Sequence, residues 1–282
     1  REQPRSRGLG DVYKRQYLLE LFGNKIMSLI IKEIDSHIAW LTVNRPDALN
    51  AMNEDVINEL ESAVKSSIND DSVGVIIITG SGEKAFIAGA DIKKMQKMSS
   101  EEALVFGKSG QQLTLTIENS TKPVIAAVNG YALGGGCEIS LACHMRVCSD
   151  NAMFGQPEVL LGLLPGWGGT QRLPKIVGIG IANEIITTGR MIKSSEAHKI
   201  GLVNHVVKQD QLKTKCEEIA NQILKNGPNA IAESLSCIRH GDGKATQDGL
   251  EEEAIRFSKL FGKKESDEGL SAFVNKRDPK FR

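Results

Sequence analysis

Residues 122–138, KPVIAAVNGYALGGGCE, decide how this chain folds. The apolar run at 123–129 is typical of a strand that is buried on both faces. The three glycines that follow, residues 134–136, turn the chain into a helix that starts near Cys137. Glycine in regular structure costs about 0.5–1 kcal/mol relative to alanine, so a plain turn seldom needs three. The stretch therefore predicts a turn at which backbone N–H groups can approach a ligand, at the positive end of a helix.

Strand and helix patterns alternate on both sides of this stretch, which predicts an α/β body of repeated strand–helix units. Helices are expected after Asn53, after the capping-box pair Ser99 and Glu102, and from residue 194. The segments at 84–91 and 166–172 are interpreted as a loop of small residues and a glycine-rich loop. Strands are expected at 38–43, 73–79, 123–129, 145–147, 152–154 and 202–207.

Beyond Asp210 the apolar residues recur at helical spacing alone. Pro228 is expected to start one helix and Ser266 to cap the last one. We expect a core domain over 27–223 that holds the active site, and a C-terminal helical oligomerisation region over 224–282. An exposed helical tail of this kind often buries its apolar stripe against another subunit.

Residues 1–26 have no periodic pattern, and Met27 is a natural start. We interpret this segment as a non-native or disordered leader, left by upstream translation or an expression vector. A mitochondrial transit peptide is the alternative: the arginines fit it, but Glu2, Asp11 and Glu20 do not.

Composition excludes several classes of protein. The 282 residues are 40% hydrophobic, and Lys plus Arg equals Asp plus Glu at 35 each, which argues against a nucleic-acid-binding protein. No apolar run reaches the roughly 20 residues of a membrane span. The five cysteines suggest reduced thiols in the cytoplasm, or in the mitochondrial matrix of a eukaryote. Cys143, His144 and Cys148 match no zinc spacing, so no metal is expected.

Two glutamates are the candidate catalytic residues. Glu138 follows the glycine turn within a helix of apolar neighbours, and Glu158 lies in the apolar stretch 154–166, FGQPEVLLGLLPG. A buried glutamate is costly unless it is paired or functional. Two carboxylates at one pocket can divide acid and base work when their surroundings separate their pKa values. A surface glutamate or a salt-bridged structural acid remains the alternative for each.

A third element is Asp91 with Gly89 and Ala90, where small residues would let the Ala90 N–H reach a ligand. An Asp that caps a helix is the compatible alternative. The sequence does not match a dinucleotide-binding fingerprint, because Ile139 occupies the position of its third glycine. It also has no G-x-S-x-G motif of a serine hydrolase.

From Met27 onward the chain resembles the enoyl-CoA hydratase (crotonase) family. The matching motifs are NRPDALNAM (44–52), KAFIAGADIKKM (84–95), KPVIAAVNGYALGGGCE (122–138), FGQPEVLLGLLPGWGGTQRLP (154–174) and EGLSAFVNKRDPKF (268–281). The resemblance implies a crotonase (ClpP-like) spiral of ββα units with a C-terminal helical region. It also implies a homotrimer or a dimer of trimers.

The resemblance further implies roles for individual residues. The N–H groups of Ala90 and Gly135 would form an oxyanion hole for the thioester carbonyl. Glu158 would give a proton to C2, and Glu138 would activate the water that attacks C3. The reaction would be reversible syn addition of water to a trans-2-enoyl-CoA, with no cofactor besides the CoA of the substrate.

The acyl-CoA is expected to contact further residues. Trp167 would narrow the acyl pocket and favour short chains, and Lys276 would meet a CoA phosphate, on a neighbouring subunit where the geometry requires it. The complete expected binding set is Ala48, Lys84, Ala85, Ala88, Asp91, Ile92, Gly134, Trp167, Phe273 and Lys276.

Two alternative functions stay open. One is a Δ3,Δ2-enoyl-CoA isomerase or another acyl-CoA enzyme of the family, although isomerases typically keep one catalytic carboxylate. The other is a non-catalytic RNA-binding member, which the intact acids and glycine turn argue against.

Overall fold

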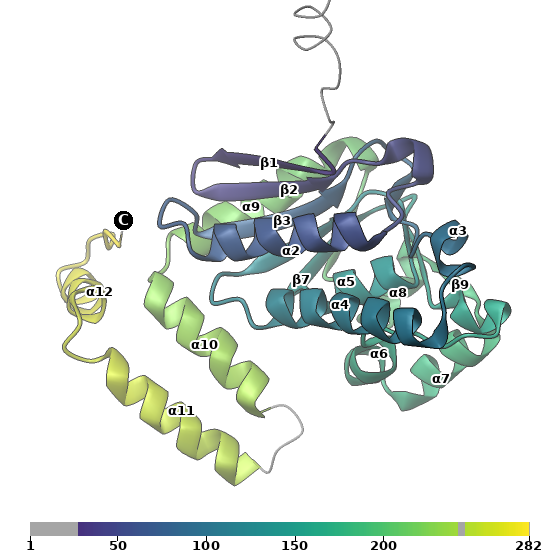
Figure 1. Ribbon diagram of the computed structural model, residues 1–282. Coiled ribbons are helices and arrows are strands. Elements are labelled where there is room, and N and C mark those ends of the chain that lie inside the picture. The colour runs from purple at the N-terminus through teal and green to yellow at the C-terminus, as the bar shows by residue number, and fades with distance from the viewer. Residues whose placement is uncertain (1–27, 242–245, 282) are drawn as a thin grey trace, which may run out of the picture.

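The computed structural model describes residues 28–241 and 246–281, so the expected leader lies outside the described residues (Figure 1). A six-stranded sheet has the order β1-β2-β3-β5-β7-β10, in which the β1–β2 pair is antiparallel and the other pairs are parallel. Its strands are β1 (Ile30–Asp35), β2 (Ile38–Val43), β3 (Val75–Gly80), β5 (Val124–Val128), β7 (Met145–Ser149) and β10 (His205–Val207).

A second, smaller sheet has the order β4-β6-β8-β9, and its first three strands run parallel. The strands are β4 (Ala85–Ile87), β6 (Tyr131–Leu133), β8 (Met153–Gly155) and β9 (Met191–Lys193). Three times in succession the chain passes through the large sheet, then the small sheet, then a helical segment. This repeat is the ββα spiral that the resemblance implies, and the expected fold class is confirmed.

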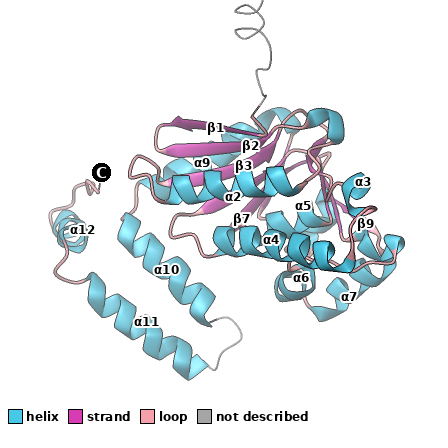
Figure 2. Ribbon diagram, in the orientation of Figure 1, coloured by secondary structure: helices cyan, strands magenta, loops and turns pink. Residues whose placement is uncertain are grey.

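Helices cover both faces of the large sheet (Figure 2). One core lies beneath α2 and α4, and a second, smaller core lies beneath α9, whose buried residues are Leu212, Cys216 and Ala220. The helical segments of the body are η1 (Pro46–Ala48), α2 (Glu54–Ile68), α3 (Ile92–Met95), α4 (Ser100–Glu118), α5 (Gly135–Ala142), η2 (Pro157–Leu161), α6 (Gly169–Val177), α7 (Ile179–Thr188), α8 (Ser194–Lys199), η3 (Gln209–Gln211) and α9 (Leu212–Leu224).

Three further helices follow: α10 (Pro228–Gly241), α11 (Thr246–Leu260) and α12 (Lys264–Val274). They extend from the body on the side away from α3 and α7 (Figure 1). Within the described ranges, no helix is long and apolar enough to cross a membrane.

Local capping signals are partly confirmed. Asn53 accepts the N–H of Val56, and Ser99 with Glu102 forms the expected capping box. The expected cap at Ser266 is wrong: α12 begins at Lys264, so Ser266 lies within its first turn. Asp91 occupies the N-cap position of α3, but its side chain makes no capping hydrogen bond and pairs with Arg45 at 3.3 Å.

The close packing of α5 on β4 gives a prediction about stability. A Cβ at Gly136 would collide with the carbonyl oxygen of Ile87, whereas a Cβ at Gly107 on α4 would meet nothing within 4 Å. Gly136→Ala should lower the free energy of unfolding by about 1–3 kcal/mol because α5 must move. Gly107→Ala should raise it by about 0.5–1 kcal/mol through helix propensity. Urea unfolding of both variants measures these changes. Equal shifts of the two free energies of unfolding in the same direction would contradict the prediction.

Candidate active site

The candidate site lies where the three parallel strands of the small sheet end. Ala90 follows β4, the glycines at 134–136 follow β6, and Glu158 follows β8. The carboxyl ends of parallel neighbours meet at one edge of a sheet, which is where ligands bind in many α/β proteins. The pairing of β4, β6 and β8 therefore brings together three segments that are far apart in sequence.

The backbone of Ala90 is oriented by an isolated parallel bridge to Met52. The Met52 N–H donates to Gly89 O (2.9 Å), and the Asp91 N–H donates to Met52 O (2.8 Å). In a parallel bridge of this kind the central residue directs its own N–H away from the partner strand. The Ala90 N–H thus faces away from Met52, in a direction from which it could donate to a ligand oxygen.

The glycine turn places a second donor beside the first. Gly134 adopts φ +50°, ψ −122°, a conformation that glycine tolerates and side chains disfavour. Gly135 is the first residue of α5, and its N–H is one of the four that a helix leaves without an intrahelical acceptor. A Cβ at Gly134 would approach Glu158 Oε1 to 2.9 Å, so the turn packs directly on that carboxyl group.

Glu138 is enclosed in the protein interior, with 1% of its surface exposed. Its Oε1 accepts the N–H groups of Trp167 and Gly169, each at 2.7 Å. Burial raises the pKa of Glu138, whereas the Gly169 and Trp167 N–H groups and the charge of Arg172 oppose that rise. The two backbone donors fix one oxygen of the carboxyl group in place.

Glu158 is half-buried on η2 and has a different environment. Burial raises its pKa to about 7; its own backbone N–H lowers the pKa, and the Glu138 charge raises it further. With the Gln156 amide turned so that both of its ends are satisfied, its nitrogen donates to Glu158 Oε1 (3.0 Å) and Oε2 (3.2 Å). Sequence reasoning assigned no role to Gln156, because its burial and its contact with Glu158 become visible only in the folded chain.

Together these groups form an arrangement suited to enolate chemistry. Glu138 and Glu158 interact electrostatically, and two N–H donors lie at the same edge. Donors held in place before charge develops stabilise an oxyanion, and two acids in unlike surroundings can act as acid and base. Across residues 28–241 and 246–281 no cluster of three metal-ligating side chains is present, and all five cysteines are free thiols.

Six of the expected CoA-binding residues lie on η1 or on the segment from Lys84 to Ile92. Ala48 on η1 lies beside the oxyanion segment, because the Ala88 N–H donates to the neighbouring Leu49 O at 3.1 Å. Asp91 borders the same segment, and Ile92, 58% exposed, opens α3 beside it. Lys84 is exposed and Ala85 buried at the opposite, amino end of β4, so that pair lies farther from Ala90.

Trp167 is buried, with 3% of its surface exposed, between α4 and α5. A Cβ at Gly110 or at Gly135 would overlap its indole, and the Phe106 ring packs edge-on at a centroid distance of 5.4 Å. The indole therefore lies directly behind the glycine whose N–H is the expected oxyanion donor. Whether it also limits the acyl chain stays a prediction.

Two expected binding residues are not brought to this site within one chain. Phe273, 86% exposed, and Lys276 belong to α12 and the turn after it. That helix lies on the far side of the molecule from α3 (Figure 1). A contact from these residues to the ligand would need a second copy of the chain.

The unlike surroundings of the two acids give a prediction. Glu138→Gln should lower the pKa of Glu158 below about 7 because a neighbouring negative charge is removed. The pKa should stay above its ordinary value of 4.5, because burial is the larger cause. Infrared titration of the carboxyl band checks this, with the exposed Glu101→Gln as the control that should change nothing. An unchanged Glu158 titration in Glu138→Gln would refute the coupling.

Comparison with known proteins identifies the family of this chain. Residues 33–282 match the family model of enoyl-CoA hydratase/isomerase. The chain is 45% identical over 248 residues to a short-chain-enoyl-CoA hydratase of Clostridium acetobutylicum, covering 88% of this chain and 95% of the relative. It is also 45% identical over 252 residues to a crotonyl-CoA hydratase of Syntrophomonas wolfei, covering 89% and 97%. The crystal structure of an enoyl-CoA hydratase from Bacillus anthracis superposes with a TM-score of 0.88 at 37% identity, covering 90% of this chain and 99% of that one. The chain belongs to the enoyl-CoA hydratase/isomerase family.

Proposed function

We propose that this protein is an enoyl-CoA hydratase that adds water reversibly to short-chain trans-2-enoyl-CoA thioesters. The observation that carries the proposal is the pair of glutamates in unlike environments, next to two backbone donors. Glu138 is held as a hydrogen-bond acceptor by two N–H groups, whereas burial favours the protonated form of Glu158 near neutral pH. The names of relatives at 45% identity support the same reaction.

In the hydration direction the thioester carbonyl binds the Ala90 and Gly135 N–H groups. Glu138 takes a proton from water as the water oxygen forms a bond to C3. The electron pair of the C2–C3 double bond moves toward the carbonyl and gives an enolate, which the two N–H groups stabilise. Glu158 then donates its proton to C2, and the product is the 3-hydroxyacyl-CoA. Addition is syn because both carboxyl groups act from one side of the substrate.

One proton on the pair of acids serves both directions. Hydration starts with Glu138 ionised and Glu158 protonated, and dehydration starts with the reverse. Neither direction consumes a proton overall, since only water is added or lost. The pair is therefore active while it holds a single proton, and its apparent pKa values belong to the pair.

A short acyl chain is favoured by the packing behind the site. The Trp167 indole fills the space next to Gly135 and packs against Phe106, which supports the proposal that the acyl pocket takes short chains. Ala48, Ala88, Asp91 and Ile92 border the Ala90 segment and are the residues of this chain that we assign to CoA contact.

The proposal is tested by crotonyl-CoA hydration with wild type, Glu138→Gln and Glu158→Gln. Each substitution should lower kcat/KM by about 10²–10⁴-fold, because it removes one proton-transfer group. Wild-type kcat/KM should be highest at four carbons and fall along a series to sixteen. Surviving activity in either variant would disprove the assigned roles, and a preference for long chains would disprove the role of Trp167.

A 3-enoyl-CoA substrate distinguishes the proposed hydratase from an isomerase of the same family. Isomerisation of that substrate by a folded wild-type protein that does not hydrate crotonyl-CoA would identify an isomerase. Urea unfolding of each variant is the control for loss of structure.

We further propose that the C-terminal helices assemble the protein as a homotrimer or a dimer of trimers. Large apolar side chains are exposed along them, and monomers rarely leave such surfaces open.

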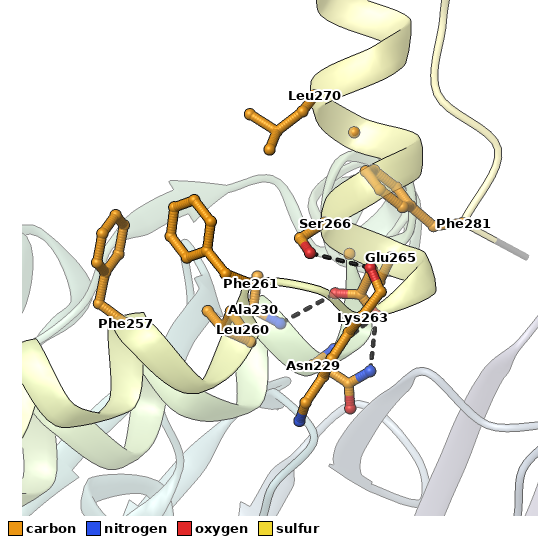
Figure 3. A pocket seen from close by; sticks show the side chains of 12 residues that line it. Asn229, Ala230, Phe257, Leu260, Phe261, Lys263, Glu265, Ser266, Leu270 and Phe281 are labelled. Carbon is orange, nitrogen blue, oxygen red and sulfur yellow. Dashed lines mark hydrogen bonds between the residues drawn. The ribbon is translucent and has the colours of Figure 1, made fainter.

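A groove of about 290 Å³ between α11 and α12 is lined by Phe257, Phe261 and Leu270 (Figure 3). Glu265 fixes α12 on α10 by accepting the N–H groups of Asn229 and Ala230, each at 3.1 Å. This groove lies away from the glutamate pair, which suits an interface better than a substrate pocket.

The assembly is tested by the mass in solution. Analytical ultracentrifugation should give three or six times the chain mass of 30.6 kDa. Phe261→Asp should lower the mass, because it places a charge on the apolar surface. Lys259→Asp changes the charge two residues earlier, at the end of α11, and serves as the control. A monomeric wild type would refute the proposal.

A further inference from the structure

We infer that Arg172 and Gln111 are positioning residues for Glu138, acting on the turn at 166–169 whose N–H groups bind its carboxylate. Neither side chain touches the substrate in this inference. It rests on the proposed function of Glu138, and it concerns how that carboxyl group is held.

The peptide units of the turn link each N–H donor to a neighbouring carbonyl group. Each peptide is planar, so a hydrogen bond to its C=O also fixes the direction of its N–H. The Trp167 N–H belongs to the same unit as Gly166 O, and the Gly169 N–H belongs to the same unit as Gly168 O. The partners of these two carbonyl groups therefore aim both donors at Glu138.

The carbonyl groups of residues 166, 167 and 168 each have a partner. The Gln111 amide of α4 donates to Gly166 O (2.9 Å), and the N–H groups of Gln171 and Arg172 donate to Gly168 O (3.0 and 2.9 Å). The intervening Trp167 O accepts Arg172 Nη1 at 3.0 Å. The Thr114 hydroxyl lies 3.0 Å from Trp167 O, but it has one hydrogen and also lies 2.9 Å from Gln111 O.

The turn at 166–169 packs directly against the side chain of Arg172. Gly168 has φ +111°, and a Cβ there would collide with Arg172 Nη1, so the backbone lies directly against the guanidinium. Nη2 pairs with Glu118 Oε2 on α4 at 2.8 Å. Side-chain exposure is 11% for Arg172 and 35% for Glu118. The guanidinium thus ties the turn to the end of a long helix.

Stability alone does not account for this arginine. The ion pair with Glu118 is weak evidence for stabilisation, because Glu118 is 35% exposed and solvent screens the attraction. Arg172 Nε is also buried without a hydrogen-bond partner in the described part of the chain. An unpaired buried donor is costly. The energetic cost of the unpaired Arg172 Nε is compensated where the guanidinium fixes a reactive carboxyl group.

The charge of Arg172 gives the inference a distinct pH signature. The titratable and charged groups that face Glu138 are Arg172 on α6, Glu158 on η2 and the Cys137 thiol beside it on α5; Glu118 on α4 lies behind Arg172. Arg172 favours the ionised form of Glu138. Without this charge the pKa of Glu138 rises, and the acid limb of the kcat/KM profile moves to higher pH.

The experiment measures crotonyl-CoA hydration against pH for Arg172→Gln, Arg172→Lys and Gln111→Met. Arg172→Gln should lower kcat by about 10–100-fold, since a displacement of about 1 Å costs as much, with KM changed less than about threefold. Its acid limb should move to higher pH. Arg172→Lys keeps the positive charge, so the acid limb of its kcat/KM profile should stay at the wild-type pH. Its kcat should nevertheless fall. Gln111→Met, an exposed and uncharged change, should lower kcat about 3–10-fold without moving the limb.

Matched variants control for general effects. Gln112→Met alters the next residue of α4, and Arg190→Gln alters an arginine that pairs with Glu184 and Glu196 on the surface; both should match wild type. The inference is overturned when Arg172→Gln and Gln111→Met stay within about twofold of wild-type kcat, or when the acid limb of Arg172→Gln does not move. An inactive wild type would refute the proposed function instead. In that case infrared titration of Glu138 decides: a raised pKa in Arg172→Gln supports the inference, and an unchanged pKa overturns it.

Discussion

The parallel pairing of β4, β6 and β8 is the constraint on which the site depends. Each of these strands has three residues, and alone none would be stable. They are held because each continues a turn of the spiral that begins in the large, buried sheet. Since all three run in one direction, their carboxyl ends bring Ala90, Gly135 and Glu158 to one edge. The backbone topology thus places the two proposed oxyanion donors and one proposed acid at the same edge of the small sheet.

Helix α5 connects this edge to the core, and it is buried along its whole length. A buried helix must satisfy its end groups within the protein. At its carboxyl end the Arg146 guanidinium donates to Ser140 O (3.1 Å) and Cys143 O (2.7 Å). At its amino end the Gly135 N–H remains available for an anionic oxygen. The protein therefore neutralises the helix dipole at its carboxyl end, and the amino end is where we propose that the thioester oxygen binds.

The sequence predicted the parts of this fold that have strong local signals. The long apolar strands β3 and β5 and the caps at Asn53 and Ser99 were recognised in this way. The short strands β4 and β6 were missed, because three residues are too few to show a period and Lys84–Asp91 reads as a loop. The glutamates were found because charges in apolar runs are unusual. Gln156 and Arg172 were not, because their importance comes from partners at other positions, which no local pattern reveals.

The chemistry of the two acids follows from position and not from residue type. Both are glutamates, and burial raises the pKa of both. Glu138 lies in a helix and accepts two backbone N–H groups, which favour its charge. Glu158 lies on a 3₁₀ turn, and the nearby charge of Glu138 further disfavours its own ionisation. When one of two adjacent acids is held ionised, repulsion keeps the proton on the other. The hydrogen bonds to Glu138 therefore add to the effect of burial in favouring the protonated form of Glu158, and in the proposed mechanism the turn at 166–169 influences both proton transfers.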